Sequence, residues 1–375
     1  MKIDRKRFFS AIPVWAWMLL FVVLLAVSLV EHDAPRKPDV SPKPDDPAKT
    51  GAPASVLAVR VLDVGQGDSI FVRFPGGGTM LVDAGGSNAG PKVVESLRSL
   101  GVRKIDILVA THPHEDHIGG MLHVLDAFPV GKIWDSGYIH GSRTQQRFLE
   151  AVKERGIRFG RPKGGFSEKN GGVLIEVLAP VSEITGTSSD ANNNSLVLRL
   201  SLGAVSFLLT ADMEKEQRRS VGRFPESTVL KVSHHGSRNG TDARFLNMVR
   251  PKVAIISCAA RNPYGHPHTE VLLFLEKAEA ELFTTIGGDV VVETDGETFT
   301  ARKETGEKKA VGKQAPLYVG NRSSRVFHLS KPDEEHPQGE SVVCGGLPAE
   351  RNRVFFQSAG DAIKAGYRPC GRCFQ

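Results

Sequence analysis

The residues that decide the fold read ILVATHPHEDHIGG, from Ile107 to Gly120. An apolar run of strand character leads directly into a segment with four metal-competent side chains within six positions. His112 and His114, two apart on an extended turn, can present two imidazoles to one ion. Asp116 and His117, at the start of a following helix, can face a second ion. Because a solvated loop seldom gathers such side chains behind a buried strand, the segment predicts a metal centre at the end of that strand.

The rest of the chain predicts strands and helices in alternation. Apolar runs bounded by glycine-rich turns predict strands over 57–64, 70–74, 80–82, 105–110, 173–178, 196–202 and 205–209. Helical periodicity covers 91–100, 119–127, 145–155, 242–249 and 269–278. Strand-rich runs with helices on both sides predict two packed sheets with helices outside, which is an α/β sandwich of four layers.

Further motifs flank the histidine segment in a fixed order. Upstream lie LDVGQGDS (Leu62–Ser69) and LVDAGG (Leu81–Gly86), and downstream lie LLTAD (Leu208–Asp212), LKVSHHGS (Leu230–Ser237) and NPYGHP (Asn262–Pro267). Together they resemble the metallo-β-lactamase superfamily, and within it the soluble, nuclease-like domain of ComEC-type competence proteins. The resemblance covers residues 55–303 and implies an αββα sandwich that holds two divalent ions for hydrolysis.

The resemblance also implies roles for individual residues. In the family, the aspartate after the Leu-Leu-Thr strand bridges both metals, which implies this role for Asp212. A histidine of the Ser-His-His-Gly-Ser segment closes the second metal site, and we favour His235 over His234 as that ligand. The alternative interpretation is a surface turn in which both histidines form hydrogen bonds and bind no metal.

The chain departs from the wider superfamily at the first metal, which usually receives a third histidine between the first motif and Asp212. No histidine occurs from Gly141 to Leu230, and the segment DANNNS (Asp190–Ser195) stands in that interval. Oxygen or amide donors, or water, would then complete the shell, which makes manganese or magnesium competitive with zinc. A turn with several Asx hydrogen bonds is an equal alternative for the asparagine run.

Two cations held in this way lower the pKa of a shared water and clamp the oxygens of a phosphoryl or acyl centre. The predicted catalytic residues are Asp116, His117, Lys231 and His266. Asp116 can hold the attacking water, while Lys231, His266 and Asn262 are candidates for contacts with an anionic substrate. The residues expected to orient the metal ligands are Asp68, Asp83, Asn194 and Asn262, with Gln66 in the same loop as Asp68. Taken alone, such side chains are more often structural or solvated.

The N-terminal residues predict a membrane segment. Four basic residues among the first seven precede an uncharged stretch from Phe8 to Val30, which is long enough to span a bilayer. The charge asymmetry across the stretch places the N-terminus inside and the remainder outside the cytoplasmic membrane. We therefore expect a single-pass bacterial membrane protein with an extracytoplasmic hydrolase domain. A signal peptide cleaved near Ala26–Ser28, which would release a secreted protein, is the alternative.

Two linkers divide the chain. Residues 31–54 are rich in proline and nearly devoid of apolar side chains, so they predict a solvated, semi-extended linker. A shorter charged linker at 304–315 separates the hydrolase domain, 55–303, from a C-terminal module at 316–375.

The C-terminal module carries three of the four cysteines, Cys344, Cys370 and Cys373. It resembles the small zinc-binding domain named for the Ada DNA-repair protein. The resemblance implies one structural zinc bound by these cysteines and a fourth donor, for which we favour His328 over His336. A Cys370–Cys373 disulfide is the alternative in an oxidising compartment. The remaining cysteine, Cys258, stands in an apolar run and is expected to be buried and inert.

A formal net charge of +6 favours an anionic partner. We therefore predict a membrane-anchored, metal-dependent phosphodiesterase or nuclease that acts on DNA, with zinc or manganese as its metal and magnesium as a further candidate. The alternatives are a hydrolase of a small or cell-wall phosphoester, and a DNA-binding surface protein with little or no catalysis. The sequence predicts neither the strand preference nor the oligomeric state.

Overall fold

The computed structural model describes residues 56–304 and, in the C-terminal part, 318–331, 341–342, 348–356, 362–363, 365–371 and 373. The predicted membrane segment, the proline-rich linker and residues 305–315 of the second linker lie outside the described residues. Within the described part of the chain, no helix combines the length and the apolar character that crossing a membrane requires.

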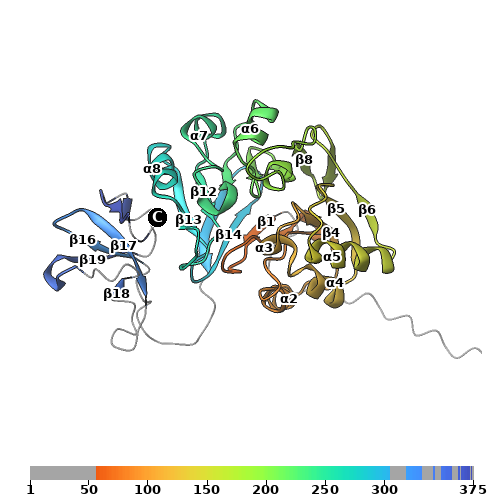
Figure 1. The fold of residues 1–375 in the computed structure, drawn as a ribbon, viewed down its shortest axis with the longest axis horizontal. Helices are drawn as coiled ribbons and strands as arrows, with labels where there is room; N and C mark the ends of the chain where they lie inside the picture. Colours follow the sequence, from red (N-terminus) through yellow and green to blue (C-terminus); the bar gives the residue numbers. More distant parts are fainter. Residues whose placement is uncertain are drawn as a thin grey trace, which may run out of the picture. The chain divides into compact units, whose positions relative to one another are not determined.

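The first sheet contains the strand that precedes the histidine segment. Its eight strands run in the order β15-β14-β1-β2-β3-β4-β5-β6 (Figure 1). Strands β3 to β6 are parallel, and the other neighbours are antiparallel. The strand bounds are β1 Leu57–Val61, β2 Ile70–Arg73, β3 Thr79–Val82, β4 Ile105–Ala110, β5 Val130–Asp135, β6 Arg158–Gly160, β14 Asp289–Thr294 and β15 Phe299–Glu304.

The second sheet has seven strands in the order β13-β12-β11-β10-β9-β8-β7. Strands β10 to β13 are parallel, whereas β7 to β10 form an antiparallel meander. The bounds are β7 Ser167–Asn170, β8 Val173–Ala179, β9 Val197–Leu202, β10 Val205–Leu209, β11 Val229–Lys231, β12 Val253–Ile256 and β13 Glu281–Thr284. Each sheet therefore has a block of parallel strands whose carboxyl ends share one edge.

Alternation along the strands builds the layers, because successive side chains point to opposite faces of a sheet. In β4, Ile107 and Val109 join the core between the two sheets, which also contains Phe207 of β10. Leu108 and Ala110 point the other way, into a second core under the helices. Since both faces of β4 are covered from Ile107 onward, this part of the strand is apolar on both faces.

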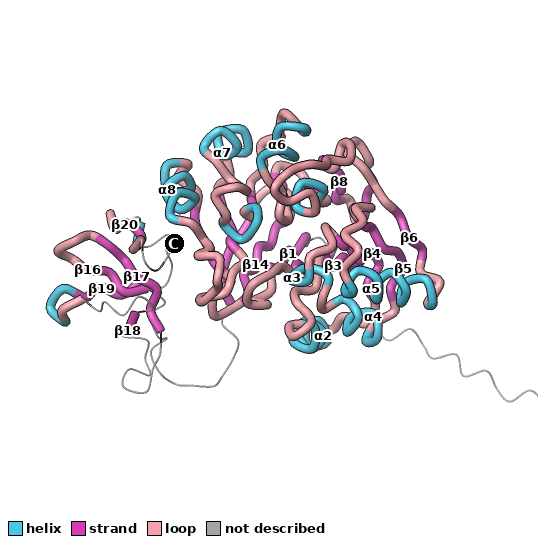
Figure 2. The backbone as a smooth tube through the Cα atoms, viewed as in Figure 1, coloured by secondary structure: helices cyan, strands magenta, loops and turns pink. Residues whose placement is uncertain are grey.

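Helices cover the outer face of each sheet, with the strands between them (Figure 2). Helices α2, α4 and α5 contribute apolar side chains to the core on the outer face of the first sheet. Helices α7 and α8 do the same on the second sheet. The bounds are α2 Gly90–Ser99, α3 Glu115–Ile118, α4 Met121–Ala127, α5 Arg143–Glu154, α6 Lys215–Val221, α7 Ala243–Val249 and α8 Thr269–Lys277. The predicted four-layer sandwich is therefore confirmed.

Short 3-10 segments and a small C-terminal sheet complete the described structure. The 3-10 segments are η1 Pro75–Gly77, η2 Asn192–Asn194, η3 Ser233–Gly236 and η4 Glu350–Asn352. The C-terminal sheet has the order β18-β17-β16-β19, and β20 pairs in parallel with β17. Its strands are β16 Tyr318–Asn321, β17 Val326–Lys331, β18 Ser341–Val342, β19 Arg353–Phe356 and β20 Arg368–Pro369.

Candidate metal centre

The predicted metal ligands follow the carboxyl ends of parallel strands in both sheets. The histidine segment 112–117 comes directly after β4, Asp212 follows β10, and the histidine pair follows β11. Because the carboxyl ends of neighbouring parallel strands share an edge, residues separated by more than 100 positions in the sequence meet there. The structure brings them together in two groups of ligand atoms.

Site B is the group of Asp116, His117, Asp212 and His235, whose ligand atoms all lie within 4.8 Å of one another. Asp212 Oδ1 is 3.3 Å from His117 Nε2 and 3.4 Å from His235 Nε2. Asp116 Oδ2 is 3.3 Å from His235 Nε2. Two carboxylates and two imidazoles thus surround one point, which is a donor set suited to a divalent ion.

Site A is the group of His112, His114 and Asp212, with ligand atoms again within 4.8 Å of one another. His112 Nε2 lies 3.1 Å from His114 Nδ1 and 3.8 Å from Asp212 Oδ2. Asp212 therefore turns one carboxylate oxygen to each site, as a bridging ligand must.

Buried atoms without protein partners test whether these groups fit a cation. His117 Nε2, His235 Nε2 and Asp212 Oδ1 are buried and form no hydrogen bond among the described residues. A buried polar atom left unsatisfied costs about 1–3 kcal/mol, so three of them at one point would be strongly destabilising. A divalent ion removes this cost, and the residues of site B fit such an ion.

The charges around Asp212 agree with its role as a metal ligand. Burial alone would raise the pKa of this carboxyl group, but His235, His117 and His234 around it hold the pKa well below its usual value. Asp212 is therefore ionised at neutral pH, which is the form that binds a metal.

The two histidines after β11 face different oxygens of Asp212. Both residues have a left-handed backbone, with φ of 48° at His234 and 55° at His235. His235 Nε2 faces Oδ1 in site B, whereas His234 Nε2 lies 3.6 Å from Oδ2, on the side of site A. The pair was predicted to supply one ligand to the second metal site, but each histidine faces a different oxygen of Asp212.

Glu214 and Asn192 stand behind His234, and neither was predicted. Glu214 Oε1 lies 3.0 Å from His234 Nδ1 and accepts a hydrogen bond from Asn192 Nδ2 at 3.2 Å. This arrangement leaves His234 Nε2 to face Asp212. The signal in the sequence was an acidic residue two positions after the bridging aspartate.

Asn194, which was expected to orient the ligands, has a different role. Its amide donates to the carbonyl oxygens of Ile184 and Asp190 and accepts from Ile184 N–H. These hydrogen bonds shape the preceding loop, which agrees with the alternative interpretation of the asparagine run as a turn with several side-chain hydrogen bonds.

Asp83 orients His117, as predicted. Asp83 Oδ2 is 2.8 Å from His117 Nδ1, and Thr111 holds the carboxylate by donating through both its N–H and its hydroxyl group. His235 is held similarly, with Nδ1 2.9 Å from the carbonyl oxygen of Ser257. In both rings Nδ1 is thereby occupied and Nε2 is left for a metal.

Lys231 and Asn262 differ from the prediction that they contact substrate. Lys231 is 1% exposed and donates to Asp68 Oδ2 at 2.8 Å, and Asp68 Oδ1 lies 3.5 Å from His235 Nδ1. Asn262 bonds through both amide atoms to the backbone of its own loop, including N–H and C=O of His266. Lys231 therefore supports Asp68, and Asn262 shapes the loop.

His266 lies beside the metal centre as a buried, neutral ring. Its centroid is 5.3 Å from that of His234. Burial lowers the pKa of His266 to about 3. Cys258 is also buried, and burial raises the pKa of its thiol to about 12, which agrees with the predicted inert role.

The metal centre opens into a cleft of about 810 Å³. His114, Asp116, Gln66, His140 and Tyr264 are among the residues that line it. Tyr264 is 60% exposed and stacks on His266 at an interplanar angle of 26°. A substrate in this cleft would meet an aromatic face next to the metal ligands.

The C-terminal module contains a separate group of possible ligands. His328, Cys370 and Cys373 place their ligand atoms within 4.8 Å of one another, and Cys373 Sγ is 3.8 Å from His328 Nδ1. Cys344 and His336 lie outside the described residues. Three donors of this kind agree with the preference for His328 in a zinc site.

Two family models match the sequence of the chain, and several known proteins are similar to it. A model of the metallo-beta-lactamase superfamily matches residues 62–260, and one of the metal binding domain of Ada matches residues 314–375. The chain is 33% identical over 248 residues to ComE operon protein 3 of Bacillus subtilis, covering 60% of this chain and 31% of that protein. It is 34% identical over 220 residues to competence protein ComA of Neisseria gonorrhoeae, covering 57% of this chain and 29% of that protein.

The chain thus spans about three tenths of the length of these curated relatives. Among solved structures, the metallo-beta-lactamase fold protein YhfI from Bacillus subtilis aligns with a TM-score of 0.39 and 12% identity, covering 61% of this chain and 96% of that one. The family match takes in more than half of the 375 residues. The chain belongs to the metallo-β-lactamase superfamily and carries an Ada-like zinc-binding domain after it.

Proposed function

We propose that this protein is a two-metal phosphodiesterase that cleaves DNA outside the cytoplasmic membrane, to which the segment from Phe8 to Val30 anchors it. The observation that carries the proposal is Asp212, whose two oxygens face separate groups of ligands 3.3 to 3.8 Å away. A carboxylate placed in this way can contribute one oxygen to each of two divalent ions.

The chain supplies enough donors for both ions. Site B offers Asp116, His117, Asp212 and His235, and site A offers His112, His114 and Asp212. We assign the remaining position of site A to His234, because its Nε2 lies 3.6 Å from Asp212 Oδ2. With His234, site A has three imidazole donors, a set that suits zinc and reduces the case for magnesium. Bound ions would lower the pKa of a water and neutralise charge on a phosphate.

The remaining roles in the proposed reaction belong to Asp116, His117 and Lys231. Asp116 is the carboxylate that both belongs to a ligand group and lines the cleft, with 31% of its side chain exposed. It is therefore placed to hold the attacking water and accept its proton. Buried His117 and Lys231 act as a ligand and a positioning residue, and neither contacts the substrate.

Three features favour DNA over other phosphodiesters. The net charge of +6 attracts a polyanion. Tyr264 presents an exposed aromatic face on which a base can stack. A relative in Neisseria gonorrhoeae is named as a competence protein, which is compatible with a role in handling DNA.

The test is DNA cleavage by the full-length, detergent-solubilised chain with zinc, manganese or magnesium. We expect cleavage by the wild type and by His123→Ala, an exposed histidine on α4, and none by His117→Ala, which also loses bound metal. Hydrolysis of small diesters but not DNA would establish the phosphoester alternative instead. DNA binding without cleavage in every metal would leave only the binding role.

A further inference from the structure

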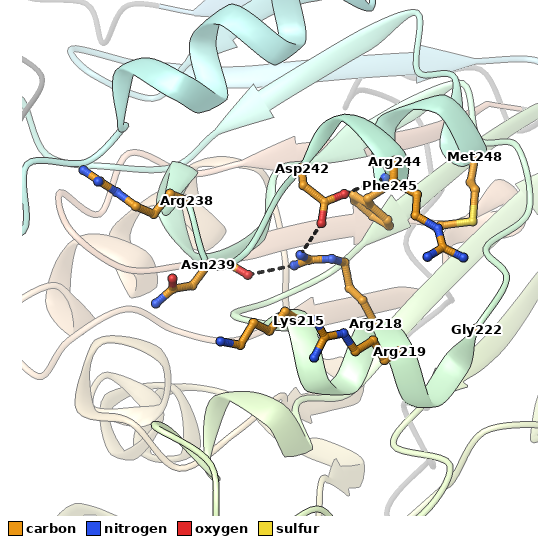
Figure 3. A pocket seen from close by; sticks show the side chains of 10 residues that line it. All are labelled: Lys215, Arg218, Arg219, Gly222, Arg238, Asn239, Asp242, Arg244, Phe245 and Met248. Atoms are coloured by element: carbon orange, nitrogen blue, oxygen red, sulfur yellow. Dashed lines mark hydrogen bonds and ion pairs between the residues drawn. The ribbon is translucent and has the colours of Figure 1, made fainter.

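A second hollow, apart from the metal cleft, lies between α6 and α7 and has a volume of about 380 Å³. Five of its lining side chains are basic: Lys215, Arg218, Arg219, Arg238 and Arg244. Figure 3 shows three of them on α6, Arg238 on the loop after η3, and Arg244 on α7. The single acidic side chain is Asp242, so the lining has an excess of four positive charges. We call this hollow the basic pocket.

Arg218 and Asp242 form the frame of the basic pocket. Arg218 donates to Asp242 Oδ2 at 2.7 Å and to the carbonyl oxygen of Asn239 (Figure 3). It also donates to the carbonyl oxygen of Gly240. Asp242 also caps α7 by accepting from Phe245 N–H at 2.8 Å. The only carboxylate of the pocket is therefore committed to structure and does not neutralise the other four cations.

The other four cations are weakly compensated. Arg238 pairs with Glu270 at 3.3 Å, but both side chains are more than half exposed, at 56% and 53%. Lys215 lies 3.5 Å from Glu216. Exposed pairs of this kind contribute little. Arg219 and Arg244 are exposed and form no ion pair within the described part of the chain.

The basic pocket continues from the loop that carries the metal ligands. Segment η3 ends at Gly236, and Arg238 is the second residue after it. Arg238 N–H donates to His268 Nδ1 at 3.1 Å, and the ring of His268 lies 4.9 Å from that of His266 beside the metal centre. The basic pocket thus begins, along the chain, three residues after His235.

We propose that the basic pocket binds the phosphate backbone of the nucleic acid whose scissile bond lies at the metal centre. Four cations spread over three segments suit a chain of negative charges, as the successive phosphates of one strand provide. The part of this inference that concerns the scissile bond rests on the proposed function. Binding of the phosphate backbone does not rest on the proposed function, because it requires neither metal nor cleavage.

The test measures binding without metal. Fluorescence anisotropy in EDTA would follow a labelled single-stranded oligonucleotide, and the duplex of the same sequence, binding to the full-length chain over a range of salt concentrations. The test variant is Arg219→Gln with Arg244→Gln. The matched control is Arg98→Gln with Lys153→Gln, which removes the same charge from exposed positions on α2 and α5. Thermal melting would show that both variants are folded.

Each phosphate-contacting side chain contributes about 1 to the slope of log K against log salt concentration. We therefore expect the slope to fall by about 2 in the test variant and to stay unchanged in the control. Equal slopes in the two variants would overturn the proposal, even if both cleave DNA. Binding of phosphatidylglycerol vesicles that depends on Arg219 and Arg244, without a change in oligonucleotide binding, would overturn it as well. If the slope falls in the test variant but neither the wild type nor any variant cleaves DNA, the result would support backbone binding by the basic pocket and refute only the proposed nuclease activity.

Discussion

Replacing Lys231 by methionine tests whether this lysine supports the metal centre from behind or contacts the substrate. Its ammonium group lies 2.8 Å from Asp68 Oδ2, and both side chains are 1% exposed. Lys231→Met keeps the apolar length of the side chain and removes the charge. Asp68 then stays buried without its cation, 3.5 Å from His235 Nδ1.

The magnitude follows from the burial of the pair. Removing one partner of a buried ion pair costs about 3–5 kcal/mol, whereas removing both is often close to neutral. We therefore expect Lys231→Met to lose about 3–5 kcal/mol of unfolding free energy at pH 7, and Asp68→Asn in the same chain to restore most of it. Burial would raise the pKa of Asp68, but Lys231 and His235 outweigh burial and lower it. The contribution of the pair is thus present above about pH 4 and is lost as the pH falls.

Urea denaturation followed by circular dichroism measures these differences. Lys252, an exposed lysine just before β12, provides the control, and Lys252→Met should stay within about 0.5 kcal/mol of the wild type. Equal stability of Lys231→Met and Lys252→Met would refute the buried pair. A stable Lys231→Met protein with a raised KM would instead restore the interpretation that Lys231 contacts the substrate.

Two further substitutions test other parts of the fold. Burial raises the pKa of Asp135 to about 6. At about 1.4 kcal/mol per pKa unit, this shift means that the ionised carboxylate costs the folded protein about 3 kcal/mol of unfolding free energy. Asp135→Asn should therefore stabilise the protein at pH 8 and lose this advantage near pH 4. Urea denaturation at both pH values checks this, and an equal effect at both would contradict it. A Cβ at Gly67 would lie 2.2 Å from the carbonyl oxygen of Asp116, whereas one at Gly65 would meet nothing within 4 Å, and both glycines have positive φ. Gly67→Ala should therefore weaken zinc binding in a chelator competition titration. Gly65→Ala should cost about 1 kcal/mol of stability and leave the zinc affinity unchanged. Equal zinc affinity of the two variants would show that the close approach of Gly67 to Asp116 does not matter.

The sequence predicts the main elements where the apolar signal is long. The runs that predict β1, β4, β8, β9 and β10, and the periodic segments that predict α2, α5 and α8, all appear in the structure. Strands β11 and β12, of three and four residues, were not predicted. They become strands through parallel pairing with β10 and β13, which local sequence does not reveal.

The metal centre was predictable to the extent that its ligands are local. The four ligands of the histidine segment fall within six residues, and family resemblance added Asp212 and the histidine pair. Asp68 and Asp83 were predicted behind the ligands, but the pairing of Asp68 with Lys231 was not, because the two residues are 163 positions apart and meet only when the two sheets pack. The separate directions of His234 and His235 depend on two left-handed backbone conformations, which residue type alone does not specify.

The turn that holds this histidine pair has a thermodynamic consequence. Consecutive residues share a peptide plane, so the φ and ψ angles that aim His235 at one ion also help to aim His234 at the other. Fixing one residue's backbone costs about 1–2 kcal/mol, and the first ion to bind would already have met that cost for the second. Each ion would thereby raise the affinity of the centre for the other, by a factor of at most about 5 to 30 when this free energy is converted to an affinity ratio. A chelator that removed one ion would weaken the binding of the other by the same factor.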